Sequence, residues 1–206
     1  MKDIKIEYLS GNGSFDSDEC VELLKECDVV VTNPPFSLFR EYVALLIQYN
    51  KKFLIIGNMN AITYKEIFPY IKNNEIWLGV SKRSLDFILP NGNITNVNSI
   101  WFTNIDHKKR HQEIDLYKKY NSEDYPKYDN YNAIDVSKVC EIPMDYDGVM
   151  GVPITFLDKY CPTQFEIIGW SRHNDMNMDG GFWLGGKADA TINGKEVYRR
   201  ILIKKL

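Results

Sequence analysis

Asn33-Pro34-Pro35-Phe36 is the segment of this chain whose residue types could do chemistry. The two prolines hold the backbone extended and force Asn33 out of the helical region. They lack N–H donors but keep their carbonyl acceptors, and Asn33 adds a side-chain carbonyl. Such a rigid loop beside an aromatic ring suits a flat heterocycle with an exocyclic amine. The acceptors take the amine hydrogens, the ring of Phe36 stacks on the heterocycle, and the nitrogen lone pair is exposed to an electrophilic methyl group.

The elements around this loop predict where it lies in a fold. Before it, Asp28 to Thr32 contains an unbroken β-branched run, which is typical of a strand buried on both faces of a parallel sheet. After it, apolar residues recur at helical spacing from Ser37 to Tyr49, and Phe53 to Gly57 reads as the next buried strand. Ligands bind at the carboxyl ends of strands in open α/β sheets. The loop therefore occupies a position where a site is expected.

Further elements complete an alternating pattern in the first part of the chain. Ile4 to Leu9 predicts a short strand, and Asp18 to Glu26 predicts a helix that Asp16 or Ser17 caps. Thr63 to Ile71 reads as a helix that Pro69 bends or ends, and Ile76 to Val80 reads as a strand. Alternating strands and helices favour a doubly wound α/β sheet with right-handed crossovers.

The pattern changes after residue 80. Leu85 to Leu89 and Ser99 to Asn104 are expected to form an antiparallel pair, because Asn91-Gly92 between them is a turn signal. Asn193-Gly194 predicts a second hairpin, between Ala190–Ile192 and Val197–Ile203, while Asn121 to Asn132 reads as irregular. The predicted fold class is α/β: a partial doubly wound, Rossmann-like sheet, mostly parallel with an antiparallel hairpin, plus a loop-rich C-terminal annex. We place the domains at 1–106 and 107–206, which can also form one domain.

Composition excludes several classes of protein. The chain has 206 residues, of which 44% are hydrophobic, and 25 Lys and Arg against 28 Asp and Glu give a net charge of −3. Wholesale disorder and nucleic-acid binding by bulk positive charge are therefore excluded. No apolar run approaches the ~20 residues that span a bilayer, and the start carries no apolar leader. Four cysteines without a Cys-x-x-Cys pair complete the prediction of a reduced, cytoplasmic protein with no membrane partner.

Two local clusters of positive charge stand out against this acidic balance. Residues 107–119 hold five basic against two acidic side chains, and residues 195–206 hold five against one. Solvated surface is the ordinary interpretation of each cluster, and a face for an anion is the alternative. His107 and His111 lie four apart, but no third ligand stands nearby, so we predict no metal site. The tyrosines between 117 and 131 fit either a small core of their own or a nucleic-acid contact, whereas Trp101 and Phe102 read as sheet core.

The Asn-Pro-Pro-aromatic motif after a strand resembles the catalytic motif of S-adenosylmethionine-dependent amino-methyltransferases. Enzymes with this motif act on DNA adenine or cytosine, on guanine in ribosomal RNA, or on glutamine amides in proteins. Longer stretches of this chain closely resemble the EcoRI-type adenine-specific DNA methylases, and they are found at residues 30–40, 53–63, 101–111, 145–155 and 200–203.

The resemblance implies a site-specific DNA adenine N6-methyltransferase, a modification methylase of the restriction-modification kind, or a C-terminal fragment of one. It implies S-adenosylmethionine as the methyl donor and double-stranded DNA as the partner, with the target adenine flipped out of the duplex. Asn33 and the Pro34 carbonyl would hold the N6 amine, Phe36 would stack on the base, and Pro35 would stiffen the loop. Candidate phosphate contacts are the basic residues of the two clusters, namely Lys108, Lys109, Arg110, Arg199 and Arg200.

Two departures from the family pattern concern the cofactor. The glycine-rich turn and the ribose-binding acid are expected upstream of the catalytic loop, and we do not find them in this sequence, so the N-terminal cofactor-binding part is expected to be lacking. Ser14 and Phe15 are the candidate cofactor-binding residues, although the family tends to have an acid in place of Ser14. The edge of Val29–Thr32 is then expected to be covered by Ile4–Tyr8, by a second copy, or by a separate chain that supplies the missing strands.

Two other functions stay open from the sequence. The chain could be a DNA-binding or complementation module without activity of its own, which the incomplete cofactor site favours. It could also be an RNA or protein amide methyltransferase built around the same loop.

Overall fold

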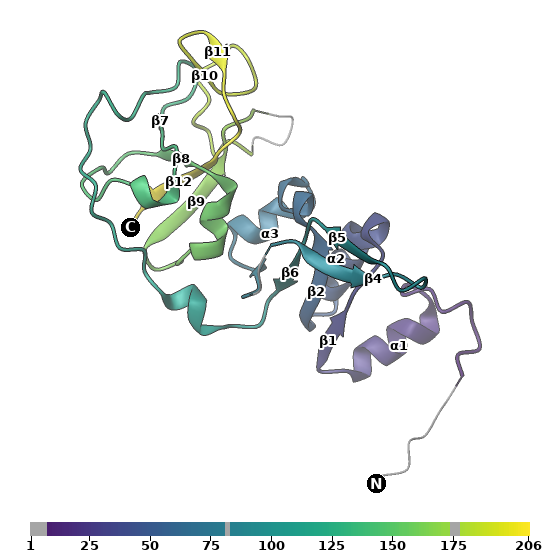
Figure 1. Ribbon diagram of the computed structural model, residues 1–206. Helices are drawn as coiled ribbons and strands as arrows, with labels where there is room; N and C mark the ends of the chain where they lie inside the picture. Colours follow the sequence, from purple (N-terminus) through teal and green to yellow (C-terminus); the bar gives the residue numbers. More distant parts are fainter. Residues whose placement is uncertain (1–7, 81–82, 174–177) are drawn as a thin grey trace. The chain divides into compact units, whose positions relative to one another are not determined.

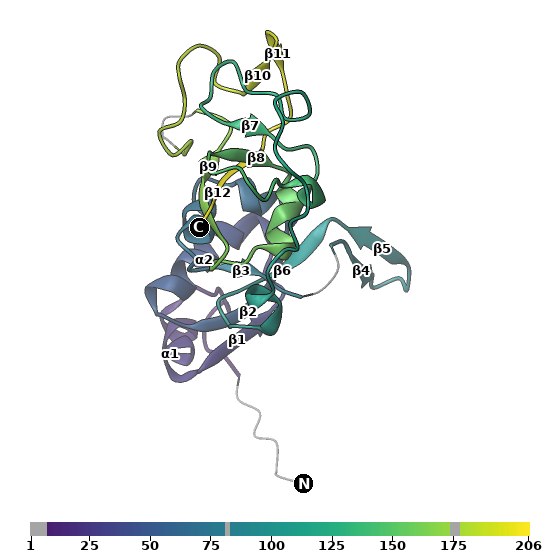
Figure 2. The ribbon, with the colours of Figure 1, turned by 90° about the vertical axis from the view of Figure 1, so that its left-hand side faces the viewer.

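The computed structural model describes residues 8–80, 83–173 and 178–206. These residues form two compact units (Figures 1 and 2), one made of residues 8–67 and 83–105, the other of 68–80 together with 106–173 and 178–206. The segment 68–80 thus belongs with the C-terminal half of the chain. No helix in the described part of the chain is long and apolar enough to cross a membrane.

Two helices of the first unit form where the sequence predicts them. Helix α1 spans Asp18–Glu26, and the side chain of its N-cap Ser17 accepts a hydrogen bond from the Cys20 N–H at 3.3 Å. A single 3₁₀ turn, η1 (Phe36–Leu38), leads into helix α2 (Phe39–Gln48), and a second 3₁₀ helix, η2, spans Met59–Thr63. Helix α2 buries Phe39, Val43 and Leu46, which lie on one face at spacings of four and three.

The sheet of the first unit is built around strand β2 (Lys52–Asn58). Strand β1 (Val29–Thr32) pairs with β2 in parallel, from Val29 opposite Lys52 to Thr32 opposite Ile55. Strand β6 (Ser99–Thr103) pairs with the other side of β2 in antiparallel register. The residues of β2 from Ile55 to Gly57 are buried, and β2 is therefore the middle strand that positions both neighbours.

Strand β1 is not buried on both faces, so that prediction was wrong. Val29 and Val31 expose 46% and 63% of their surface, and β1 is an outer strand of the sheet with β2 as its one neighbour among the described residues. A β-branched run favours a strand wherever it lies, but burial depends on what packs against each face. The segment Ile4–Tyr8, which we expected on this edge, lies outside the described residues except for Tyr8.

The antiparallel pair predicted for Leu85–Leu89 and Ser99–Asn104 was also assigned to the wrong partners. Strand β4 (Leu85–Ile88) pairs with β5 (Ile94–Val97) around the Asn91-Gly92 turn, where Gly92 has a φ of 82°. The turn therefore closes a tight hairpin, which extends away from the sheet in Figure 2. Strand β6 is left to pair with β2 instead.

The second unit contains a sheet of its own, where the sequence predicts a loop-rich annex. The strand order is β7 (Ile134–Asp135), β8 (Met150–Val152), β12 (Ile201–Lys205) and β9 (Phe165–Trp170), as Figure 1 shows. Only β7 and β8 are parallel; β12 is antiparallel to β8 and to β9. Strands this short and far apart in sequence leave a weak periodic signal, so the sheet could not be recognised from local pattern.

The second unit also contains short elements outside this sheet. Helix α3 spans Phe68–Lys72, with Pro69 in its first turn, where a missing N–H costs nothing; the helix predicted from Thr63 therefore begins five residues late. Strand β3 is shorter than predicted, at Trp77–Leu78. The hairpin at Asn193-Gly194 forms between β10 (Thr191–Ile192) and β11 (Lys195–Glu196). Three 3₁₀ helices lie between the strands: η3 (Lys108–His111), η4 (Val139–Glu141) and η5 (Ile154–Lys159).

The tyrosines between residues 117 and 131 differ in burial. Tyr125, Tyr128 and Tyr131 are buried, and Tyr128 and Tyr131 share a core cluster with Leu202. Tyr117 is exposed. The buried rings fill the small core of the second unit, as aromatic side chains do where few strands are available.

The close packing around Gly57 gives a testable prediction for the fold. A Cβ at this position would lie 2.4 Å from Phe39 Cε2 and 2.9 Å from Phe102 Cε2, inside any normal contact. We expect Gly57→Ala to lower the free energy of unfolding by about 1–3 kcal/mol, because the two rings must shift. The matched control is Gly11→Ala, whose Cβ would lie 3.5 Å from its nearest neighbour. Equal midpoints for both variants in urea unfolding would contradict the packing described here.

Candidate functional site

The Asn33–Phe36 loop lies at the carboxyl ends of the parallel strands β1 and β2. It begins directly after Thr32, the last residue of β1, and leads into η1. Pro34 is buried, while Asn33 and Pro35 are exposed and Phe36 is partly exposed. Pro35 has φ −55° and ψ 128°, and its carbonyl accepts a hydrogen bond from the Leu38 N–H at 3.0 Å. The second proline therefore anchors the loop to the turn that follows.

The side-chain carbonyl of Asn33 is exposed, and the backbone carbonyl of the buried Pro34 lies next to it in the chain. No described residue donates a hydrogen bond to the side-chain carbonyl of Asn33 or to the backbone carbonyl of Pro34. The Pro35 carbonyl, by contrast, is already bonded to Leu38. Two free carbonyl acceptors next to a partly exposed aromatic ring match the arrangement that an exocyclic amine on a flat ring requires.

Ser14 and Phe15, predicted to contact a cofactor, are both engaged within the first unit. The Ser14 hydroxyl donates a short hydrogen bond to Asp16, and its backbone N–H donates to Asn12 Oδ1 at 2.9 Å. The Phe15 ring packs edge-on against Tyr42 of α2, with ring centroids 5.1 Å apart. Glu19 accepts the backbone N–H groups of Ser10 and Gly11, and these bonds lower the pKa of Glu19. Residues 10–19 are thus held by hydrogen bonds and a ring contact within the first unit.

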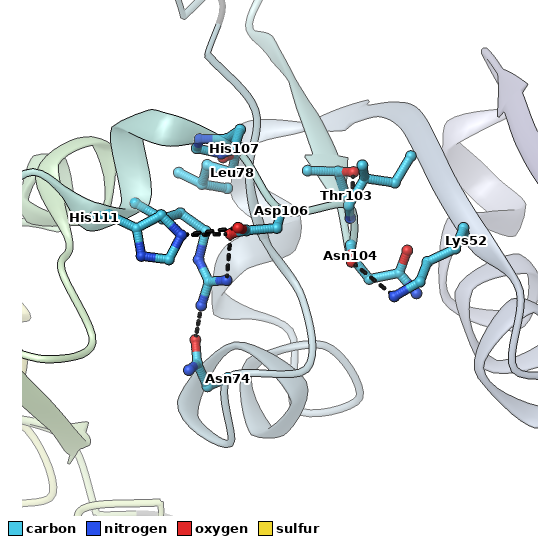
Figure 3. A network of polar contacts seen from close by, with 10 residues as sticks. Lys52, Asn74, Leu78, Thr103, Asn104, Asp106, His107 and His111 are labelled. Atoms are coloured by element: carbon cyan, nitrogen blue, oxygen red, sulfur yellow. Dashed lines mark hydrogen bonds and ion pairs between the residues drawn. The ribbon is translucent and has the colours of Figure 1, made fainter.

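Arg110, predicted as a phosphate contact, is buried inside the second unit. Its guanidinium carbon lies 3.5 Å from the centre of the Trp77 ring, and its side chain is 10% exposed. It donates a short hydrogen bond to Asn74 and lies 3.5 Å from Asp106 (Figure 3). Burial lowers the pKa of Arg110, while nearby Asp106 opposes that shift. A buried guanidinium held in this way does not reach a DNA backbone, so Arg110 is dropped from the candidate contacts.

The neighbours of Arg110 on η3 differ from it. Lys108 is exposed, and Lys109 is partly exposed and lines a pocket of about 350 Å³. His111 bonds to Asp106 at 2.9 Å and lowers the pKa of that carboxyl, whereas the His107 ring bonds to the Leu78 carbonyl at 3.0 Å (Figure 3). The two histidines therefore have separate partners. The described residues contain no group of three His, Cys, Asp or Glu side chains that could hold a metal.

Arg199 and Arg200 are adjacent in sequence but bind different carboxylates. Arg199 Nε donates to Asp189 at 2.9 Å, with its side chain 52% exposed. Arg200 Nε donates to Asp135 at 3.0 Å, with its side chain 17% exposed. Sequence reasoning missed Asn74, Asp135 and Asp189, because these partners lie ten to 65 residues from the arginines they bind. No spacing rule connects residues so far apart.

Comparison with known proteins places the chain in a family. The family model described as adenine-specific methyltransferase EcoRI matches residues 1–98 and 91–206. The chain is 50% identical over 222 residues to the Type II methyltransferase M.EcoRI of Escherichia coli, which covers 98% of this chain and 65% of the relative. It is 40% identical to M.MgeORF184P of Mycoplasma genitalium, over 96% of this chain and 70% of the relative. It is 38% identical to M.MpnI of Mycoplasma pneumoniae, over 99% and 72%.

The chain spans just under two thirds of the length of the Escherichia coli relative, and somewhat more of the two Mycoplasma relatives. No solved structure matches the chain.

The burial of Arg110 predicts a structural effect rather than a DNA-binding one. Arg110→Lys keeps the positive charge, but lysine lacks the planar guanidinium that stacks on Trp77 and that donates to Asn74 and Asp106 at once. We therefore expect the free energy of unfolding to fall by about 1–3 kcal/mol. The control Lys108→Gln removes an exposed charge and should change stability by less than about 0.5 kcal/mol. Urea unfolding measures both. An Arg110→Lys variant as stable as the parent chain would show that the guanidinium is not held as described.

Proposed function

We propose the function of this chain on the basis of its family, because the chain belongs to the EcoRI-type adenine-specific methyltransferases. In this proposal the protein is a site-specific DNA methyltransferase that modifies N6 of adenine in double-stranded DNA, as the modification enzyme of a restriction-modification system. The methyl donor is S-adenosylmethionine. The observation that carries the proposal is the pair of free acceptors, Asn33 and the Pro34 carbonyl, beside the ring of Phe36.

Each residue of the loop has a role in holding the target base. The side-chain carbonyl of Asn33 and the backbone carbonyl of Pro34 accept the two N–H groups of the N6 amine. Phe36 stacks on the adenine ring, a contact worth about 1–3 kcal/mol per base. Pro35, bonded through its carbonyl to Leu38, keeps the two acceptors at a fixed separation. Holding both amine hydrogens turns the nitrogen lone pair toward the incoming methyl group.

The target adenine must leave the duplex to reach this loop. N6 is paired inside the double helix, so the enzyme flips the nucleotide out at a cost of roughly a few kcal/mol. Stacking on Phe36 and the two amine hydrogen bonds offset that cost. Transfer of the methyl group would leave N6 positively charged, and the nitrogen would then release one of its two protons to solvent. The residues of the loop bind and orient the amine.

The cofactor contacts expected of Ser14 and Phe15 stay a prediction. The hydroxyl of Ser14 is bonded to Asp16, and Phe15 is packed against Tyr42, so both side chains already have partners within the first unit. S-adenosylmethionine supplies an electrophilic methyl group when bound, and we assign no step to these two residues. We propose that other strands hold the cofactor.

The exposed edge of β1 indicates where those strands attach. Val29 and Val31 are exposed on an outer strand that ends at the catalytic loop, and an unpaired apolar edge invites another strand. We propose that β1 pairs there with a strand of a larger, Rossmann-like methyltransferase sheet. That strand is supplied by another part of the protein, by a second copy, or by a separate chain.

DNA contacts are proposed for the basic residues that stay accessible. Lys108 and Lys109 are candidates for phosphate contacts, because their side chains are not buried against carboxylates in the described structure. Arg199 is half-exposed but already paired with Asp189, so its contribution is weaker. The cysteines at 20, 27, 140 and 161 are free thiols, which fits the proposed action on DNA in the cytoplasm.

A complementation module is the second candidate function. The internal engagement of Ser14 and Phe15 and the exposed edge of β1 favour it, because both suggest that the chain needs other strands to bind the cofactor. An RNA or protein amide methyltransferase has less support, because the family description and the names of the relatives specify adenine and Type II methyltransferases. Methyl-transfer assays on DNA, RNA and protein separate these functions.

The role of Asn33 predicts a specific loss of turnover. In the active enzyme, Asn33→Ala should reduce methyl transfer to DNA by about 10²-fold or more, in line with removal of one preorganised polar group from a reacting centre. DNA affinity should stay within about twofold, since the side chain contacts only the flipped base. The control Asn132→Ala removes an exposed amide in the second unit and should leave both quantities unchanged. Wild-type turnover by the Asn33→Ala enzyme would rule out the assigned role.

We expect purified residues 1–206 to bind S-adenosylmethionine weakly, because Ser14 and Phe15 already have partners within the first unit. Titration calorimetry of S-adenosylmethionine into purified residues 1–206 should show no saturable heat, whereas a DNA duplex should still bind. Tight, saturable cofactor binding would overturn this expectation and would reveal a pocket among the residues of this chain. Methylation of DNA restored by adding a second polypeptide would favour the complementation module over an enzyme complete in one chain.

A further inference from the structure

Arg200 belongs to a buried polar set in the second unit. Tyr128 Oη donates to Asp135 Oδ1 at 2.6 Å, and Arg200 Nε donates to the same oxygen at 3.0 Å. The side chains of Arg200 and Asp135 are 17% and 10% exposed. Burial, together with the charge of Asp135, raises the pKa of Tyr128, so its hydroxyl remains a donor. The carboxylate is therefore clamped between two donors and in turn fixes the guanidinium.

The backbone of Arg200 is fixed as well. Its N–H donates to Ser171 Oγ at 2.7 Å, and the Ser171 N–H donates to the Arg200 carbonyl at 2.9 Å. Ser171 is fully buried. At Gly151 a Cβ would lie 2.2 Å from Tyr128 Oη and 3.0 Å from Arg200 Cβ, so glycine is needed for this close approach. Arg200 has thus lost most of its rotamer freedom before any ligand arrives, which removes a usual cost of binding.

The fixed guanidinium lines an open pocket. The pocket has a volume of about 500 Å³ and is lined by Asp135, Glu196, Val197, Tyr198 and Arg200. A guanidinium has five N–H donors, and Asp135 takes only the one on Nε. Tyr128 lies within hydrogen-bonding reach, but most donors on the two terminal nitrogens have no partner among the described residues. A rigid pair of donors is left for a ligand that enters this pocket.

The charges around Arg200 favour a base edge over a phosphate. Asp135 offsets the positive charge of Arg200, and the Glu196 carboxylate at the same pocket is paired with Lys187 at 3.3 Å, so these four groups together carry no net charge. A phosphate contact depends on net positive charge, which these groups reduce. Recognition of a base edge depends instead on donors in fixed geometry, which they leave intact. Guanine presents two adjacent acceptors, O6 and N7, in the major groove, whereas adenine presents an acceptor and a donor.

We infer that Arg200 reads a guanine in the DNA that this enzyme methylates, by bidentate hydrogen bonds to O6 and N7, with Asp135 and Tyr128 as positioning residues. The inference rests on the proposed function, because it requires the substrate to be duplex DNA. It changes the role expected for Arg200 from a phosphate contact, which carries no sequence information, to a determinant of the recognition sequence.

The test begins with the bound sequence. The active enzyme selects duplexes from a library with a randomised centre, and each guanine of the preferred site is then replaced by 7-deazaguanine, which lacks the N7 acceptor. We expect one guanine at which this replacement weakens binding. Exchange of that G·C pair for another pair should weaken binding roughly 5- to 150-fold in the wild type. Arg200→Gln should remove both effects at that position and leave the other positions unchanged, whereas Arg200→Lys should only weaken them, because lysine can still donate to O6 and N7.

The matched control is Arg199→Gln, the neighbouring arginine, which pairs with Asp189 outside this pocket. It should keep the preference at every position. Tyr128→Phe is a second variant in case Arg200→Gln folds poorly, and it should weaken discrimination at the same guanine because Asp135 loses one of its donors. Thermal unfolding checks that each variant is folded.

Salt dependence separates the base contact from a phosphate contact. Arg200→Gln should lose the guanine preference with no change in the slope of affinity against salt, whereas loss of a phosphate contact reduces that slope by about 1. A uniform weakening across sequences with a reduced slope would overturn the inference and leave the proposed function standing. So would a preferred site whose guanine dependence survives in Arg200→Gln. Failure of the wild-type enzyme to bind or methylate any duplex would instead defeat the proposed function, and the inference with it.

Discussion

The parallel pairing of β1 with β2 is the constraint on which the candidate active-site loop depends. Thr32 lies opposite Ile55 in this register, so the chain leaves β1 at the same end where β2 finishes. The prolines that follow cannot continue the hydrogen-bond ladder, and the Pro35 carbonyl immediately starts a turn to Leu38. Gly57 in β2 admits the rings of Phe39 and Phe102, which brings α2 and β6 close to the middle strand. The position of Asn33 therefore follows from the packing of β2.

Carboxylates position the arginine side chains of the second unit. A guanidinium is buried only when hydrogen-bond partners replace water. Of the four arginines described in this unit, Arg172 and Arg199 both pair with Asp189, whereas Arg110 and Arg200 have partners of their own. Arg110 uses Trp77, Asn74 and Asp106, Arg199 uses Asp189, and Arg200 uses Asp135. Arg110 is thus a buried structural residue, and Arg199 is a surface residue whose charge is partly neutralised. Arg200 holds its donors in a fixed position beside a pocket.

Local features of the fold were predictable because local interactions decide them. Ser17 caps α1 through its own side chain, and Asn91-Gly92 and Asn193-Gly194 close hairpins because glycine adopts a positive φ after a residue that tolerates the turn. The partner of Ser99–Thr103 was not predictable in the same way. The sequence allows β4 to pair with β6. In the structure β4 pairs with β5 instead, and β5 is only four residues long, so the sequence pattern did not reveal it.

The sequence by itself predicted the chemistry at Asn33–Phe36, because the residue types, the prolines and the preceding strand are all contiguous. Tertiary structure alone decided which strand is an outer one and which arginine is buried. Val29–Thr32 reads as a core strand, yet exposure depends on the number of neighbours in the sheet, which composition does not encode. Arg200 meets Asp135 across 65 residues, and no local pattern links them. Burial and pairing over such distances arise only when the whole chain folds, since they are set by packing between elements rather than within them.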